Sequence, residues 1–139
     1  MRIVLDTNVL ISGTFWTGTS YEVIQLIDKG KVKIITSKEI LEEYDRILHS
    51  DEILEKKAYQ SEKMTAVLKL VQIAIFVEPK EKFKVVEKDP DDDKFIDAAV
   101  EGKAEYIITQ DEHLLKLKEF RRIKIVKPEE FLETINTNK

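Results

Sequence analysis

The sequence predicts an α/β protein built on a mostly parallel β-sheet. Residues 3–5 and 106–108 are short runs of strand-forming residues without a charged side chain. Such runs are typical of strands buried on both faces, as they are in parallel sheets. Between the two runs, segments with helical spacing of apolar residues alternate with strand-like segments. This alternation requires crossover connections, so the strands that they join are expected to lie parallel.

The first elements have recognisable boundaries. Thr19 and Glu22 fit a capping box at the start of a helix, and Gly30 fits its end. Ser37 fits the N-cap of the next helix. The sequence therefore predicts a strand over 3–5, a loop over 13–18, a helix from Thr19, a strand over 31–36 and a helix over 38–48.

The rest of the chain continues the alternation, with one boundary open. Residues 51–60 and 61–75 show helical spacing, but 74–77 contain strand formers before Glu78 and Pro79, so this stretch fits either a helix end or a strand. The further predicted elements are an extended connection over 80–88, a helix over 95–100, a strand over 106–108, a helix over 112–117, a strand over 123–126, a helix from Pro128 and a frayed tail over 136–139.

Length and composition limit the function. The 139 residues suit a single domain, 1–139, with a real core. The absence of cysteine excludes disulfides, thiolate nucleophiles and cysteine-type zinc sites. With only His49 and His113, an imidazole metal site is not expected. No apolar run could span a bilayer and no signal peptide is recognisable, so a soluble cytoplasmic protein is expected. The net charge of −4 argues against a general binder of polyanions.

Acidic residues follow two of the predicted buried strands. Asp6 comes directly after residues 3–5, and Thr109 and Asp111 follow residues 106–108. The carboxyl ends of parallel strands meet at one edge of a sheet, where ligands bind. Asp6 is therefore a candidate metal ligand, although an Asx turn would also explain it. Asp111 could equally be the N-cap of the following helix, and the two roles are compatible.

Two further stretches carry acids that could reach the same edge. Glu43 borders the apolar stripe of the helix over 38–48, where a solvated surface position is the usual alternative. Four aspartates lie within residues 89–93, more than a helix start needs, and their repulsion is relieved by solvent or by a shared divalent cation. Asp92 or Asp93 is expected to point back at the strand ends.

These stretches, in this order, resemble the PIN-domain ribonucleases, which include VapC-like toxins of toxin–antitoxin systems. The resemblance covers nearly the whole chain and implies a three-layer α/β/α sandwich with a central, mostly parallel sheet. It implies that Asp6, Glu43, Asp92 and Asp111 are the catalytic acids and bind Mg²⁺ or Mn²⁺, with Asp93 as the alternative third acid. Asn8 and Thr109 would support this cluster.

The implied activity is metal-dependent endonucleolytic hydrolysis of RNA. Without His, Cys or Ser machinery, in-line attack on a phosphodiester needs divalent ions bound by oxygen ligands. The basic residues of 116–127 could contact the backbone of single-stranded RNA, or could be ordinary solvated surface. Trp16 could stack on an unpaired base or lie in the core or a dimer interface. A symmetric homodimer is expected, and an antitoxin partner is a further candidate.

Three other protein classes fit parts of the sequence. A phosphoacceptor receiver domain would carry a mid-chain aspartate on a strand and a lysine after the last strand. A haloacid-dehalogenase-like phosphatase would carry an acid two residues after Asp6, where this chain has Asn8. A catalytically silent nucleic-acid-binding or scaffold module of the same fold is the main alternative, because fold does not establish activity.

Overall fold

Six strands form one mixed sheet in the computed structural model, which describes residues 1–50 and 60–137. The order across the sheet is β3-β2-β1-β4-β6-β5, and every neighbouring pair is parallel except the terminal pair β5 and β6. The strands are β1 (Arg2–Leu5), β2 (Lys33–Ser37), β3 (Ile75–Val77), β4 (Tyr106–Ile108), β5 (Glu119–Phe120) and β6 (Ile123–Val126). The predicted mostly parallel sheet is confirmed.

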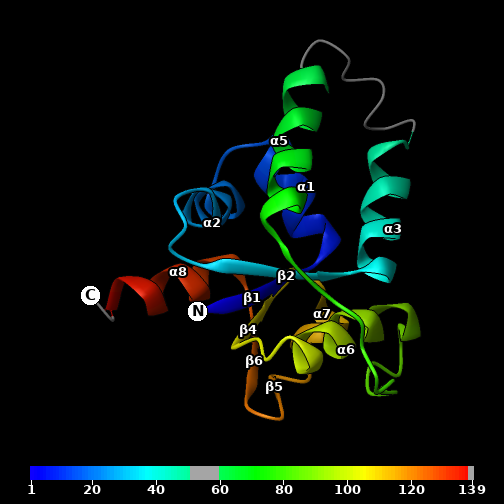
Figure 1. Cartoon of the computed structure of the whole chain (residues 1–139). Coiled ribbons are helices and arrows are strands. Elements are labelled where there is room, and N and C mark those ends of the chain that lie inside the picture. Colours follow the sequence, from blue (N-terminus) through cyan, green and yellow to red (C-terminus); the bar gives the residue numbers. More distant parts are fainter. Residues whose placement is uncertain (51–59, 138–139) are drawn as a thin grey trace.

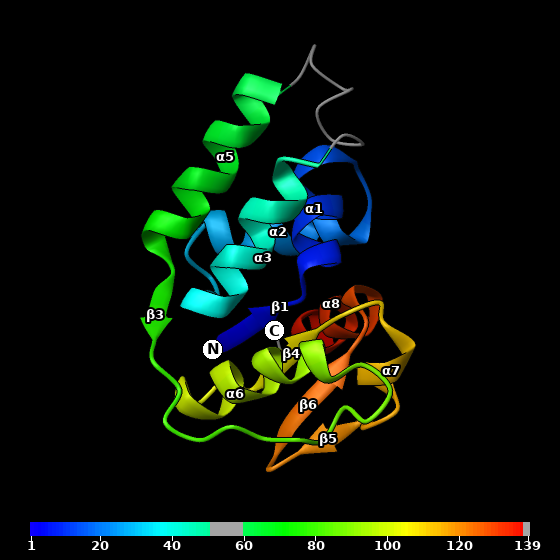
Figure 2. The ribbon, with the colours of Figure 1, turned by 90° about the vertical axis from the view of Figure 1, so that its right-hand side faces the viewer.

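Helices cover both faces of this sheet, as Figures 1 and 2 show. One layer contains α1, α2, α3 and α5, while α6 packs on the other face against β1, β2 and β4. The helices are α1 (Thr7–Phe15), α2 (Thr19–Asp28), α3 (Lys38–Leu48), α5 (Gln60–Ile73), α6 (Asp93–Glu101), α7 (Glu112–Leu115) and α8 (Pro128–Thr137), with a 3₁₀ turn η2 (Pro90–Asp92) before α6. The three-layer α/β/α architecture is also confirmed.

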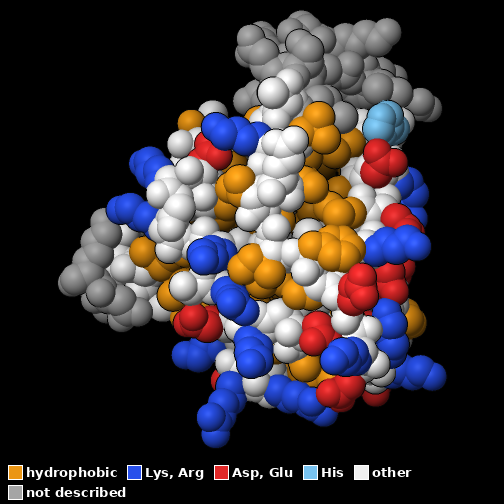
Figure 3. All heavy atoms as spheres, viewed as in Figure 1, with side chains coloured by type: hydrophobic (Ala, Val, Ile, Leu, Met, Phe, Trp, Pro, Cys, Tyr) orange, Lys and Arg blue, Asp and Glu red, His pale blue; other side chains and the backbone are white. Residues whose placement is uncertain are grey.

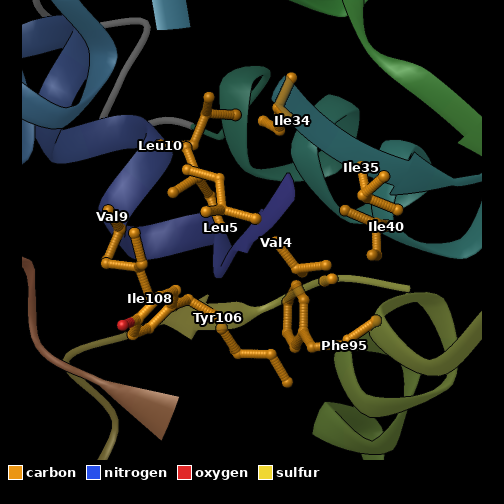
Figure 4. Packing of buried hydrophobic residues seen from close by; sticks show 14 of the residues in the cluster. Val4, Leu5, Val9, Leu10, Ile34, Ile35, Ile40, Phe95, Tyr106 and Ile108 are labelled. Atoms are coloured by element: carbon orange, nitrogen blue, oxygen red, sulfur yellow. The ribbon is translucent and has the colours of Figure 1, made fainter. Parts of the chain in front are cut away.

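The core fills both spaces between sheet and helices. Successive side chains of a strand point to opposite faces. In Figure 4, Leu5 points toward Leu10 of α1, whereas Val4 points toward Phe95 of α6. Leu5, Leu10 and Val4 are fully buried and Phe95 is 1% exposed. The two-sided burial of β1 explains why its residues are apolar without alternation.

Several predicted boundaries are wrong in detail. The first half of the predicted loop over 13–18 is helix, since α1 continues to Phe15. Gly13 is needed there for close packing: a Cβ at Gly13 would lie 2.6 Å from the backbone oxygen of Ser20 in α2. Thr19 does not cap α2, because the N-cap residue is Gly18. The Thr19 hydroxyl instead donates to Glu129 Oε1 at 2.9 Å.

The open boundary after α5 resolves as a strand, because β3 covers Ile75–Val77 and pairs with β2. Most of the predicted helix over 51–60 lies outside the described residues. The short strand β5 was not predicted, and the predicted frayed tail is helical through Thr137. Within the described residues, no helix is long and apolar enough to cross a membrane.

Candidate active site

The acidic site begins where β1 and β4 end side by side. Leu5 pairs with Ile108 in the parallel register, and the Asp6 backbone N–H donates to the Ile108 carbonyl at 3.0 Å. Asp6 and Thr109 therefore follow the last residues of two adjacent strands. Tyr44 fixes α3 to the same edge, because its hydroxyl donates to the Leu5 carbonyl at 2.8 Å.

Asp6 is buried and held by hydrogen bonds on both carboxylate oxygens. Its Oδ1 accepts the Asn8 backbone N–H at 2.6 Å, which makes Asp6 the N-cap of α1. Its Oδ2 accepts the Thr109 hydroxyl, whose oxygen in turn accepts the Asp111 backbone N–H at 2.9 Å. Burial raises the pKa of Asp6 above its ordinary value, against these hydrogen bonds. Asp6 therefore does form the predicted Asx turn, in which the backbone N–H of Asn8 is the donor.

Asp92 stands out from its acidic neighbours because it is buried, at 8% exposure. Within the described residues, Asp92 Oδ2 is one of two buried side-chain polar atoms without a hydrogen-bond partner. Burial, together with interactions with Asp111, Asp89 and Asp6, raises the pKa of Asp92 to about 8. A carboxylate in this position is costly unless a proton or a cation accompanies it.

The side chain of Asp93 is bound to the extended segment over 80–88. Its Oδ1 accepts the backbone N–H groups of Val85 and Val86 at 3.0 and 2.9 Å. One turn later, Asp97 Oδ1 accepts the Phe83 N–H at 2.8 Å. Both carboxylates therefore anchor the extended segment over 80–88 to α6. Asp92, in contrast, interacts with Asp111, Asp89 and Asp6.

Glu43 reaches the site from α3, but its carboxylate is already occupied. Its Oε2 accepts the hydroxyl of Thr7, the residue after Asp6. Its Oε1 lies 2.8 Å from Lys94 Nζ and 3.5 Å from Arg46 Nη2. Lys94 also contacts Asp91 Oδ2 at 3.0 Å. Burial lowers the pKa of Lys94, but its bonds to Glu43 and Asp91 outweigh this effect and raise the pKa on balance.

Asp111 has two neighbours that were not predicted to belong to the site. Asp111 Oδ1 accepts the His113 backbone N–H at 2.7 Å, so Asp111 is the N-cap of α7, as predicted. One ligand atom each from Asp89, Asp111 and His113 lies within 4.8 Å of the others, a spacing that could hold a metal ion. His113 was predicted to be only a surface residue of a helix, and its side chain is 42% exposed.

The unpredicted members had weak signals in the sequence. Lys94 follows Asp91 by three residues, a spacing at which helical side chains interact. Its second partner, Glu43, is 51 positions away, and nothing local indicates that contact. Asp89 and His113 could have been considered because each is close in sequence to a predicted acid.

The basic residues of 116–127 do not form one patch at the site. The exposed Lys127 follows the carboxyl end of β6, at the same edge as Asp6, and Lys116 follows α7 and lines a cavity with His113. Arg121 and Arg122 precede β6 and therefore lie at the opposite edge of the sheet. Arg121 pairs with Glu81 at 3.7 Å and stacks 4.6 Å from the Phe83 ring centre. Figure 3 shows Lys and Arg side chains gathered toward the end of the molecule that carries β5 and β6.

Comparison with known proteins bears on the family and the fold. The chain is 29% identical over 142 residues to an uncharacterized protein of Methanocaldococcus jannaschii, covering 96% of this chain and 90% of that protein. The fold of the present chain is similar, with a TM-score of 0.58 and 14% identity, to a chain in the crystal structure of VapBC2 from Rickettsia felis bound to a DNA fragment from their promoter. This match covers 90% of the present chain and 97% of the other chain. The family model of the PIN domain matches residues 2–113. The chain belongs to the PIN-domain family.

Proposed function

We propose that this protein is a metal-dependent ribonuclease that hydrolyses RNA phosphodiester bonds. The observation that carries the proposal is the unpartnered, buried Oδ2 of Asp92 beside Asp6 and Asp111. A buried oxygen of this kind is rare unless something absent from the protein chain completes it. All donors of these three residues are carboxylate oxygens, which are the ligands that Mg²⁺ and Mn²⁺ prefer.

Each acid has a proposed role. Asp6, Asp92 and Asp111 would hold the ion, and Glu43 would orient groups at the α3 side of the same site. When bound, the ion supplies activation of water and neutralises charge that develops on the phosphate. Thr109 holds Asp6 in place, and Asn8 does so through its backbone N–H. The hydrogen bonds of Asp93 to the 80–88 segment favour Asp92 as the third acid.

Single-stranded RNA is the proposed substrate. Without a cation, the acids would repel a phosphate, so the substrate must enter after the ion. Lys116 and Lys127 lie at the edge of the site and offer contacts for the RNA backbone. These two contacts are compatible with a protein whose net charge is negative.

The test is cleavage of single-stranded RNA with Mn²⁺, with Mg²⁺ and with EDTA. The wild-type protein is expected to cleave only with a metal, and Asp6→Asn to lose at least 100-fold in rate, a typical effect of losing a catalytic group. Asp45→Asn, at an exposed carboxylate of α3, is the matched control and is expected to cleave normally. Cleavage that survives Asp6→Asn would contradict the proposal, and Mn²⁺ binding without cleavage would favour the catalytically silent module.

Protein partners are part of the proposal. Leu68, Ile73 and Phe76 on α5 and β3 are each more than half exposed, as is unusual for large apolar side chains on a surface without a partner. Figure 3 shows exposed hydrophobic side chains on the face that carries these elements. We expect a symmetric homodimer, which light scattering would detect and which Phe76→Ser would weaken. The likeness to the VapBC2 complex makes an antitoxin a further expected partner, recognisable by inhibition of RNA cleavage.

A further inference from the structure

The acidic site contains a buried cation of its own. Lys94 lies in the first turn of α6, and its side chain is 7% exposed. Its Nζ lies 2.8 Å from Glu43 Oε1 and 3.0 Å from Asp91 Oδ2. A buried ammonium group is stable only with such partners, because an unpaired charge loses its hydration. Lys94 is therefore held in the site by two carboxylates from different elements.

This cation divides the acids into two groups. Both oxygens of Glu43 are occupied, one by the Thr7 hydroxyl and the other by Lys94. Over residues 1–50 and 60–137, no lysine or arginine nitrogen lies within 4.0 Å of a carboxylate oxygen of Asp6, Asp92 or Asp111. One side of the site thus has its positive charge built in, and the other side has a carboxylate oxygen without a partner.

We propose that Lys94 takes the place of a second divalent ion, so that the site holds one ion between Asp6, Asp92 and Asp111. This inference rests on the proposed nuclease function. Two-metal nucleases neutralise charge with ions about 3.5–4 Å apart. An ammonium group also supplies a compact positive charge, but it cannot coordinate ligands as a metal does. Lys94 is accordingly a positioning residue, which fixes Glu43 and prevents a cation from binding there.

The experiment counts Mn²⁺ ions bound per chain, by electron paramagnetic resonance of free Mn²⁺ and by titration calorimetry. The wild-type protein is expected to bind one ion, and Lys94→Met to bind two, because Glu43 and Asp91 then lose their buried cation and Glu43 keeps only the exposed Arg46. Lys94→Arg keeps the charge and is expected to bind one. Lys38→Met, at an exposed lysine in the first turn of α3, is the matched control and is also expected to bind one.

Each outcome has one meaning. Two ions in the wild-type protein, with RNA cleavage intact, overturn the role of Lys94 and leave the nuclease proposal standing. A single ion in Lys94→Met also overturns it. If Lys94→Met does not give the wild-type circular dichroism spectrum, Lys94→Gln replaces it, and the wild-type count remains decisive. No bound Mn²⁺ in the wild-type protein would instead refute the metal-dependent function itself.

Discussion

At the scale of single residues, the neighbours Asp92 and Asp93 have opposite roles. Asp93 stabilises the fold through two backbone N–H groups, so Asp93→Ala should lower the free energy of unfolding by about 1–3 kcal/mol. Asp92→Asn should instead raise the melting temperature of the metal-free protein by a few degrees, because it removes a buried acid from a repulsive cluster. Thermal unfolding in EDTA measures both effects. Destabilisation by Asp92→Asn would contradict this assignment.

The raised pKa of Asp92 predicts a pH dependence of stability. An unfolded aspartate loses its proton near pH 4, whereas the folded protein keeps it up to about pH 8. The folded state thus binds an extra proton between these values, and its stability should fall as the pH rises through that window and level off above it. Urea unfolding in EDTA at pH 5, 7 and 9 measures this. The stability of Asp92→Asn, used as the control, should fall less; equal pH profiles would refute the prediction.

How far a residue could be predicted depended on where its partners lie in the sequence. Asp6 and Asp111 were predicted because each follows a recognisable buried strand, which is local information. The distinction between Asp92 and Asp93 depends on the direction of two adjacent side chains, and spacing alone does not determine it. Lys94 was missed because its contact with Glu43 exists only after α3 and α6 have packed.

At the scale of elements, the crossing of α1 and α2 depends on Gly13. A Cβ at this position would meet the Ser20 backbone at 2.6 Å and Ile24 Cγ1 at 2.5 Å. Gly13→Ala should therefore destabilise the protein by about 1–3 kcal/mol, although alanine favours helices. Urea unfolding measures this, with Ser12→Ala on the same helix as control, expected within about 0.5 kcal/mol of wild type. An unchanged or higher stability of Gly13→Ala would disprove the close approach.

The same glycine explains why an element boundary was misjudged. Glycine and threonine in 13–18 have low helix propensity and indicated a loop. Tertiary packing overrides that propensity, because the contact between α1 and α2 requires a residue without a side chain. Strands β1 and β4 were predicted closely, since burial on both faces leaves a continuous apolar run. Strand β6 was also predicted, although its residue Lys124 is exposed between the buried Ile123 and Ile125. The two-residue strand β5 is too short to produce such a pattern.

At the scale of the whole molecule, the basic residues at the two ends of the strands should differ in their contribution to RNA binding. Lys116 and Lys127 lie at the carboxyl ends of the parallel strands, near the acidic site, whereas Arg121 and Arg122 lie at the opposite ends. Replacing both lysines by glutamine should reduce the slope of log affinity against log salt by about 1.4, at about 0.7 per lost contact with a single strand. Fluorescence anisotropy in the Asp6→Asn background measures this without cleavage. The double Arg→Gln variant is the control, and an equal effect there would refute the assignment.

The proposed nuclease site requires carboxylates from separate parts of the fold to bind one cation. The most direct measurement is a crystal structure of the wild-type protein soaked in Mn²⁺, with the ion located by anomalous scattering. We expect one ion with oxygens of Asp6, Asp92 and Asp111 among its ligands, and Asp93 still bonded to the 80–88 segment. An ion bound elsewhere, or none at this edge of the sheet, would contradict the proposed nuclease site.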